Sequence, residues 1–143
     1  VGTDHAPHLL SEKEGGSKKA VSGMPMVQFS LSGMLQLCDE GVLTPEIVIQ
    51  LMCHNPARLF CVDKRGFLRP GYKADFVLLR HDEPMILNSS QILSRCGWSP
   101  REGDTFNWKV CQTWVNGQLV WDGQTIACGN AGQPVRFNRK CHN

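Results

Sequence analysis

Several features of membrane and nucleic-acid-binding proteins are missing from this 143-residue sequence. No run of about 18 apolar residues occurs, although 41% of the residues are hydrophobic, so we expect no transmembrane helix and no membrane partner. Fifteen basic and 13 acidic residues leave a net charge of +2, which provides no strong electrostatic attraction to nucleic acid. The length predicts a single domain of ordinary globular composition.

Paired cysteines are also missing. The seven cysteines are an odd number, and none is arranged as Cys-x-x-Cys. A structural zinc site usually needs closely spaced ligand pairs, and a secreted disulfide framework usually has an even number of cysteines. We therefore expect reduced, mostly buried thiols and a cytoplasmic protein.

The residues best suited to chemistry stand at the start of the chain, in the segment Thr3-Asp4-His5-Ala6-Pro7-His8. Pro7 lacks an N–H and disfavours a helical residue before it, so we expect an extended or turning loop in which Asp4 and His8 converge. A carboxylate can ligate a metal ion and accept a proton from bound water. A polar surface turn is the alternative that composition alone leaves open.

A long polar loop is predicted for residues 9–25, which contain three glycines and three lysines. Loops longer than about 12 residues tend to be functional or disordered. The lysines favour a solvated face over a site for an anionic substrate. Backbone groups near Ser22 and Gly23 can approach a ligand closely, because glycine has no side chain to block it.

Helices are expected in the first part of the chain. Apolar residues of the segment 27–40 recur at intervals of three and four, which predicts an amphipathic helix ending before Gly41. Thr44-Pro45 and Asn55-Pro56 each combine a capping residue with proline, and predict the starts of two further helices. His54 is interpreted as a residue at a helix end.

Strands are expected after residue 61, at 66–68 and 75–79, and in a hairpin of 109–115 and 119–121 joined by Asn116-Gly117. Within the irregular segment 84–108, the aromatic residues Trp98, Phe106 and Trp108 are expected to fasten the segment to the body. His81-Asp82-Glu83 is interpreted as an exposed turn rather than a metal cluster.

Asp4-His5-Ala6-Pro7-His8, followed by Ser11–Gly15, resembles the signature of the dihydroorotases, which are cyclic amidohydrolases. The resemblance covers roughly residues 1–123. The further segments that agree with it are 23–28, 55–60, 66–67, 71–77, 96–100 and 113–117. Hydantoinases and allantoinases look similar but lack the second histidine. The loop reads Met24-Pro25-Met26 where many dihydroorotases have Pro-Gly, which leaves the ring contacts open.

The resemblance implies an α/β fold, the C-terminal piece of a (β/α)₈ TIM-type barrel followed by part of a small β-sandwich domain. Residues 1–61 would be the end of barrel strand 8, the active-site loop and the closing helices. Residues 62–143 would be the C-terminal portion of the small β domain, with a flexible tail from about residue 124. A complete barrel needs about 250 residues, so the missing N-terminal part of the same chain is an expected partner. A homo-oligomer is left open.

The resemblance also implies a chemistry. In dihydroorotases a hydroxide bridging two zinc ions attacks the ring amide of dihydroorotate, reversibly giving N-carbamoyl-aspartate in pyrimidine biosynthesis. Asp4 would ligate one zinc and carry the proton, and His8 would bind the substrate carboxylate. Backbone groups of Ser22 and Gly23 would contact the pyrimidine ring. His5 is assigned to packing or support.

Three hypotheses remain. The first is a dihydroorotase whose other zinc ligands lie outside this sequence, so that the chain alone is inactive. The second is another cyclic amidohydrolase, acting on a hydantoin, dihydropyrimidine or allantoin, which would have no carboxylate for His8 to hold. The third is a metal-free dihydroorotase-like scaffold domain.

Overall fold

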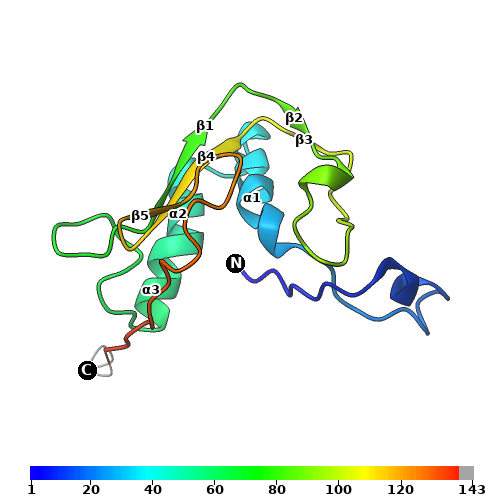
Figure 1. Cartoon of the computed structure of the whole chain (residues 1–143), viewed down its shortest axis with the longest axis horizontal. Coiled ribbons are helices and arrows are strands. Elements are labelled where there is room, and N and C mark those ends of the chain that lie inside the picture. The colour runs from blue at the N-terminus through cyan, green and yellow to red at the C-terminus, as the bar shows by residue number, and fades with distance from the viewer. Residues whose placement is uncertain (139–143) are drawn as a thin grey trace.

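The structure, a computed structural model of the chain, describes residues 1–138. An N-terminal arm (residues 1–26) contains one 3₁₀ turn (Leu10–Lys13), and is followed by helices and then strands (Figure 1). The helices lie near the centre of the molecule, the antiparallel sheet lies beside them, and the tip of the arm extends away from both (Figure 1). This helix-then-strand order was predicted from the sequence.

The first helix confirms the amphipathic pattern. A 3₁₀ turn (Val27–Phe29) leads into α1 (Ser30–Asp39), and Gly41 follows with a φ of 71°. Positive φ is easily reached only by glycine, so this residue ends the helix as predicted. Leu35 is 3% exposed, whereas Val27 at the start of the stripe is 55% exposed.

The next two predicted helices form one continuous helical rod. It consists of α2 (Pro45–Ile49), a π-helical segment (Gln50–His54) and α3 (Asn55–Leu59). The Thr44 hydroxyl caps it by accepting from the N–H of Ile47 at 3.4 Å. The predicted second start at Asn55-Pro56 instead lies at the end of the π segment. Proline has no N–H for the helical ladder and its ring crowds the preceding turn, and the wider π turn accommodates it.

A three-stranded antiparallel sheet has the order β1-β4-β5, with β1 at Phe76–Arg80, β4 at Lys109–Val115 and β5 at Gln118–Trp121. Asn116 and Gly117 have φ values of 51° and 77°. Two successive positive φ values are those of a type I′ hairpin, so the predicted hairpin is confirmed.

The strand predicted at 66–68 is wrong. These residues bend, and Gly66 has a φ of 78° and no space for a Cβ, which would lie 2.8 Å from the carbonyl oxygen of Cys53. The Phe67 ring instead stacks on the imidazole of His54 at 4.4 Å between ring centroids. This packing fixes the loop against the π segment and prevents an extended strand.

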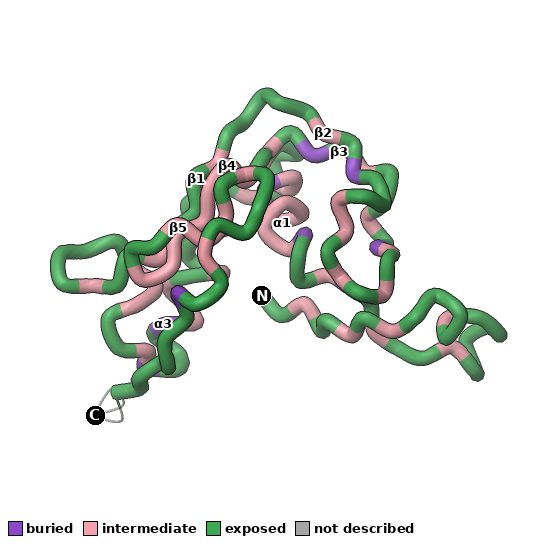
Figure 2. Tube along the Cα trace, viewed as in Figure 1, coloured by how far each residue is buried: buried purple, intermediate pink, exposed green. Residues whose placement is uncertain are grey.

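The segment 84–108 contains most of the small core. Its strands β2 (Met85–Ile86) and β3 (Thr105–Phe106) pair, and a 3₁₀ turn follows at Ser89–Gln91. Phe29, Leu87 and Phe106 pack together, each at most 6% exposed. In Figure 2 buried stretches of the chain lie beside the label of β3. The predicted role of the three aromatic residues is confirmed, since Phe106 is in this core and Trp98 and Trp108 hydrogen-bond across the fold.

Asp39, at the end of α1, accepts hydrogen bonds from residues in and near the strands. Its carboxylate accepts from the indole of Trp108 at 2.8 Å and the amide of Asn107 at 3.1 Å, and lies 3.2 Å from the His81 ring. Burial acts to raise the pKa of Asp39, but these hydrogen bonds together lower it below its usual 3.8. Hydrogen bonds to Asp82 and then Asp39 raise the pKa of His81 above its usual 6.5. The predicted exposed turn at 81–83 is confirmed, and Asp82 has a φ of 68°.

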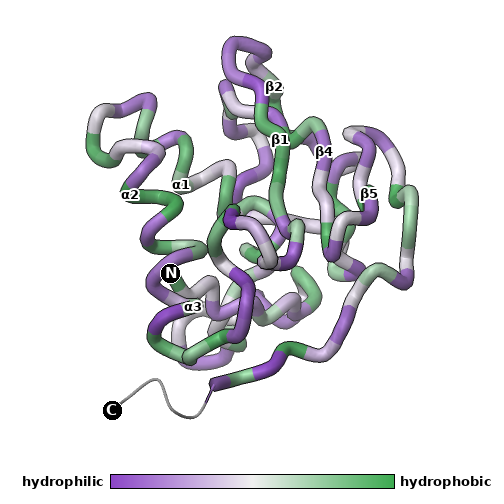
Figure 3. Tube along the Cα trace, turned by 90° about the vertical axis from the view of Figure 1, so that its left-hand side faces the viewer, coloured by the Kyte–Doolittle hydropathy of each residue, from purple (hydrophilic) through white to green (hydrophobic). Residues whose placement is uncertain are grey.

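Much apolar surface is uncovered in this chain. Side chains of the α1–α2 connection and of the helical rod are 40–67% exposed: Val42, Ile47, Ile49, Leu59 and Phe60. Hydrophobic residues also follow one another along β1 (Figure 3), where Val77 and Leu78 are 38% and 47% exposed. Large exposed apolar patches favour association with other protein surface. Within residues 1–138 no helix has the length and hydrophobicity to span a membrane.

The chain after β5 returns to the helical rod. Ile126 bridges Trp121, Ala131 is 3% exposed, and Phe137 forms an antiparallel bridge with Val62. The division at residue 61 and the flexible tail from residue 124 stay predictions, and the last five residues lie outside the described part.

Candidate functional site

The Asp4–His8 segment is extended and turning, and it pairs with the far end of the loop. His5 forms a parallel bridge with Met24, and the Ala6 N–H donates to the Met24 carbonyl at 3.1 Å. Asp4 has a φ of 45°, in the left-handed region that aspartate tolerates better than most residues. The backbone therefore turns at Asp4 before it pairs with the loop.

Gly23 lies against the segment at very close range. It has a φ of 93°, and a Cβ on this residue would lie 2.5 Å from the Cβ of Ala6. Real side chains do not approach this closely, so only glycine fits both the conformation and the space. Ser22 beside it is exposed. The structure thus brings Gly23, one of the two predicted backbone contacts, next to Ala6.

The side chain of Lys13 stabilises the loop by contacts with its backbone. Its ammonium donates to the carbonyls of Val21, at 2.6 Å, and of Gly23, and it lies 6.0 Å from the Trp98 ring centroid. An ammonium engaged with two backbone carbonyls is not a free cation for a substrate. The sequence pattern, which showed only a lysine in a polar loop, gave no sign of this role.

His8 is fixed through its backbone and its ring. Its carbonyl accepts from the indole N–H of Trp98 at 2.8 Å, and its Nδ1 lies 3.7 Å from Oε2 of Glu12. The same Glu12 oxygen accepts from the N–H of Leu9 at 2.7 Å. The spacing of four between His8 and Glu12 is the signal that sequence reasoning had available and did not use. No hydrogen bond or ion pair joins Asp4 to His8 within the described residues.

His5 points to the loop side of the segment. Its Nδ1 accepts from the N–H of Val27 at 3.3 Å, and the ring lines a cavity of about 240 Å³ with Pro25, Phe29 and Ile92. The side-chain amide of Gln28 makes two hydrogen bonds near the rim of this cavity. Its nitrogen donates to the carbonyl of Gln91 at 2.7 Å, and its oxygen accepts from the N–H of Leu93 at 2.9 Å. His5 therefore links the Asp4–His8 segment to Val27, after the far end of the loop, through this hydrogen bond. Such a contact is compatible with the assignment of His5 to packing or support.

The donor set is incomplete for a metal ion. Within residues 1–138 no three His, Cys, Asp or Glu side chains come together. A catalytic zinc ion usually has three protein ligands, and Asp4 alone offers one carboxylate. The described residues therefore do not by themselves fit a metal centre.

The sequence of this chain is similar to those of known proteins. A profile of the amidohydrolase family matches residues 1–120. A dihydroorotase of Halobacterium salinarum is 35% identical over 136 residues, which cover 95% of this chain and 32% of that protein.

Among solved structures, an L-hydantoinase (dihydropyrimidinase) from Arthrobacter aurescens is 31% identical with a TM-score of 0.86, over 94% of this chain and 31% of that one. A dihydropyrimidinase from Brevibacillus agri has a TM-score of 0.78 at 21% identity, over 89% of this chain and 29% of that one, and so supports the fold alone. The chain spans about a third of the length of each of these proteins.

Proposed function

The chain belongs to the amidohydrolase family, and we propose that it is the C-terminal third of a zinc-dependent dihydroorotase. The observation that carries the proposal is the Asp4–His8 segment, with two histidines, paired to a glycine loop and fastened by Trp98. In this proposal residues 1–61 end a (β/α)₈ barrel and close its active site. Residues 62–143 contribute to a small β domain, and the whole enzyme is cytoplasmic.

The proposed reaction is reversible hydrolysis of the ring amide of dihydroorotate to N-carbamoyl-aspartate, a step of pyrimidine biosynthesis. Water oxygen bonds to the carbonyl carbon and the carbon–nitrogen bond breaks. Asp4 accepts the proton of the attacking water and delivers it to the leaving nitrogen. Barrel enzymes place such residues at the carboxyl ends of strands, and in this proposal Asp4 follows the last strand of the barrel. His8, with its carbonyl fixed by Trp98, binds the substrate carboxylate, and the backbone at Ser22 and Gly23 contacts the ring.

In this proposal most of the zinc ligands lie outside this sequence. Asp4 would supply one oxygen ligand, and upstream residues would supply the others. We expect the isolated chain to retain no stoichiometric zinc after dialysis. One tightly held zinc per chain, lost on Asp4→Ala, would contradict this division of ligands.

A second candidate is supported by the high TM-score to an L-hydantoinase. Hydantoins and dihydropyrimidines are also cyclic amides, and the same Asp4 chemistry would open them. The two candidates differ at His8, since dihydroorotate carries a carboxylate and dihydrouracil does not.

The test uses the complete enzyme with dihydroorotate and with dihydrouracil. Asp4→Asn keeps the shape but removes the base, and should lower kcat on either ring by at least about 10²-fold. His8→Ala removes binding of the carboxylate in both ground and transition states, so KM should rise more than kcat falls. A hydrogen bond to a charged group corresponds to about 10- to 150-fold in kcat/KM.

The comparison between substrates decides between the candidates. His8→Ala should affect dihydroorotate strongly and dihydrouracil little. Equal losses on both rings would remove the carboxylate role of His8 and favour the hydantoinase-like candidate. Full activity of Asp4→Asn would contradict both candidates.

A further inference from the structure

The loop after the helical rod and the segment 133–136 lie at the end of the molecule opposite the tip of the N-terminal arm (Figure 1), and residues from both line a basic cavity. It has a volume of about 430 Å³ and is lined by seven residues: Asp63, Lys64, Arg65, Lys73, Gln133, Pro134 and Arg136. Four of its seven lining residues are basic, namely Lys64, Arg65, Lys73 and Arg136, and only Asp63 is acidic. None of these residues belongs to the candidate site described above.

Backbone hydrogen bonds build the walls of this cavity from three parts of the chain. The Asp63 N–H donates to the carbonyl of Arg136 at 2.8 Å, and the Lys73 N–H donates to the carbonyl of Lys64 at 2.9 Å. The Val62–Phe137 bridge extends the contact between the first and last of these parts. The basic side chains are therefore held around one space rather than scattered along a mobile segment.

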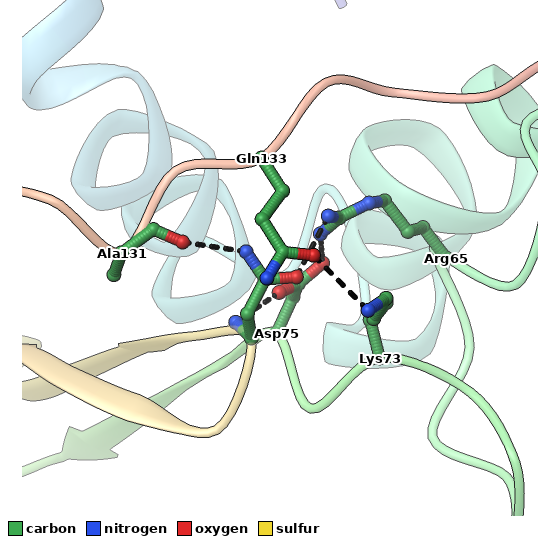
Figure 4. Close-up of polar contacts among 6 residues, drawn as sticks. Arg65, Lys73, Asp75, Ala131 and Gln133 are labelled. Carbon is green, nitrogen blue, oxygen red and sulfur yellow. Dashed lines mark hydrogen bonds and ion pairs between the residues drawn. The ribbon is translucent and has the colours of Figure 1, made fainter.

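Among the described residues, an acid neutralises only one of the four cations. Arg65 forms an ion pair with Asp75, and its other nitrogen donates to the Asn116 side chain at 2.7 Å (Figure 4). The Lys73 ammonium meets a neutral group, the side-chain oxygen of Gln133, at 3.1 Å.

Lys64 and Arg136 form no ion pair with any described residue. Together with Lys73 they leave three uncompensated positive charges around Asp63, a net surplus of two. Positive charges gathered in a cavity raise the local concentration of anions there.

We propose that this cavity binds the phosphate groups of a phosphorylated small molecule. Arginine presents a planar fork of donors that matches phosphate oxygens, and lysine adds a mobile point charge. The volume is within the range of about 300–1,000 Å³ usual for small-molecule sites. It exceeds what one phosphate needs, so the organic part of the ligand has room beside Pro134.

The first experiment titrates inorganic pyrophosphate into the complete protein by calorimetry. Saturable binding that weakens with added salt is expected, because the contacts are between charges. Lys64→Asn is a suitable variant, since Lys64 has a φ of 52° and asparagine tolerates that conformation. Lys64→Asn and Arg136→Gln should each weaken binding by roughly 5- to 10-fold. Asp63→Asn removes the opposing carboxylate and should tighten binding.

Controls separate this site from general attraction to a basic protein. Lys18→Gln removes one exposed charge of the N-terminal arm and should leave pyrophosphate binding unchanged. Circular dichroism verifies the fold of each variant, and the opposite effects expected of Lys64→Asn and Asp63→Asn are not produced by partial unfolding. Absence of saturable binding, equal loss with Lys18→Gln, or no change with Arg136→Gln would overturn the proposal. Citrate binding as tightly as pyrophosphate would overturn the choice of phosphate.

Discussion

Replacing Gly23 by alanine tests whether the close approach of the loop to the Asp4–His8 segment matters for catalysis. The new Cβ would lie 2.5 Å from that of Ala6, whereas carbon atoms in contact prefer about 3.5–4.0 Å. The loop must therefore withdraw by about 1 Å. A misplacement of that size near reacting groups can reduce rates by about 10²-fold, and we expect this loss in kcat/KM for dihydroorotate.

The same substitution has a second, separable cost. Residue 23 has a φ of 93°, and an alanine there is strained by about 1–2 kcal/mol. The double variant Ala6→Gly/Gly23→Ala removes the overlap but retains this strain. Most of the activity should return in the double variant, while the free energy of unfolding stays lowered.

Kinetics of the two single variants and the double variant in the complete enzyme form a cycle that measures the coupling. If Gly23→Ala kept kcat/KM within about twofold of the wild type, the close approach would not position the loop. A double variant as inactive as Gly23→Ala would show that the overlap with Ala6 is not the cause of the loss.

Three further outcomes are expected. Trp98→Phe removes the indole donor to the His8 carbonyl, at 2.8 Å, and should raise KM with a loss of about 1 kcal/mol in binding; an unchanged KM would contradict the positioning role. Asp75→Asn breaks a partly buried ion pair and should lower the free energy of unfolding by about 2 kcal/mol in denaturant titrations, whereas a change within the error of the fit would contradict it. The raised pKa of His81 contributes stability that is present below pH 6.5 and is lost as the pH rises through the higher pKa of the folded state. The lowered pKa of Asp39 contributes stability that is lost only as the pH falls below 3.8. Thermal unfolding from pH 6 to 9 should show the first loss, and His81→Gln should abolish it.

Features set by local chemistry were predictable from the sequence. The Thr44-Pro45 cap, the Gly41 helix end and the Asn116-Gly117 hairpin each depend on one or two residues whose backbone preferences are strong. The resemblance assigned the Asp4–His8 segment and Gly23 to one active site, but it did not predict the backbone pairing of His5 with Met24.

Features set by distant contacts were not predictable. Gly66-Phe67-Leu68 has the composition of a strand, but the contact of Gly66 with the Cys53 carbonyl and the stacking of Phe67 on His54 override it. Lys13 is similar, because its two carbonyl acceptors become adjacent only when the loop closes.

The π-helical segment changes how the residues of the helical rod must be counted. Val48 and Ala57 are both buried, yet a regular helix turning about 100° per residue would place them on opposite sides. A π turn acts as a one-residue insertion, which brings their directions to within about 80°. The buried residues before and after the π turn therefore lie toward the same side of the rod, although they follow different registers in the sequence. Deleting one residue between Gln50 and His54 would restore a regular helix and leave the side chains after it facing as they do, because eight residues at about 100° each also separate Val48 and Ala57 by about 80°. Alignments of this region with relatives should therefore allow a single-residue gap there, where an uninterrupted helix would forbid one.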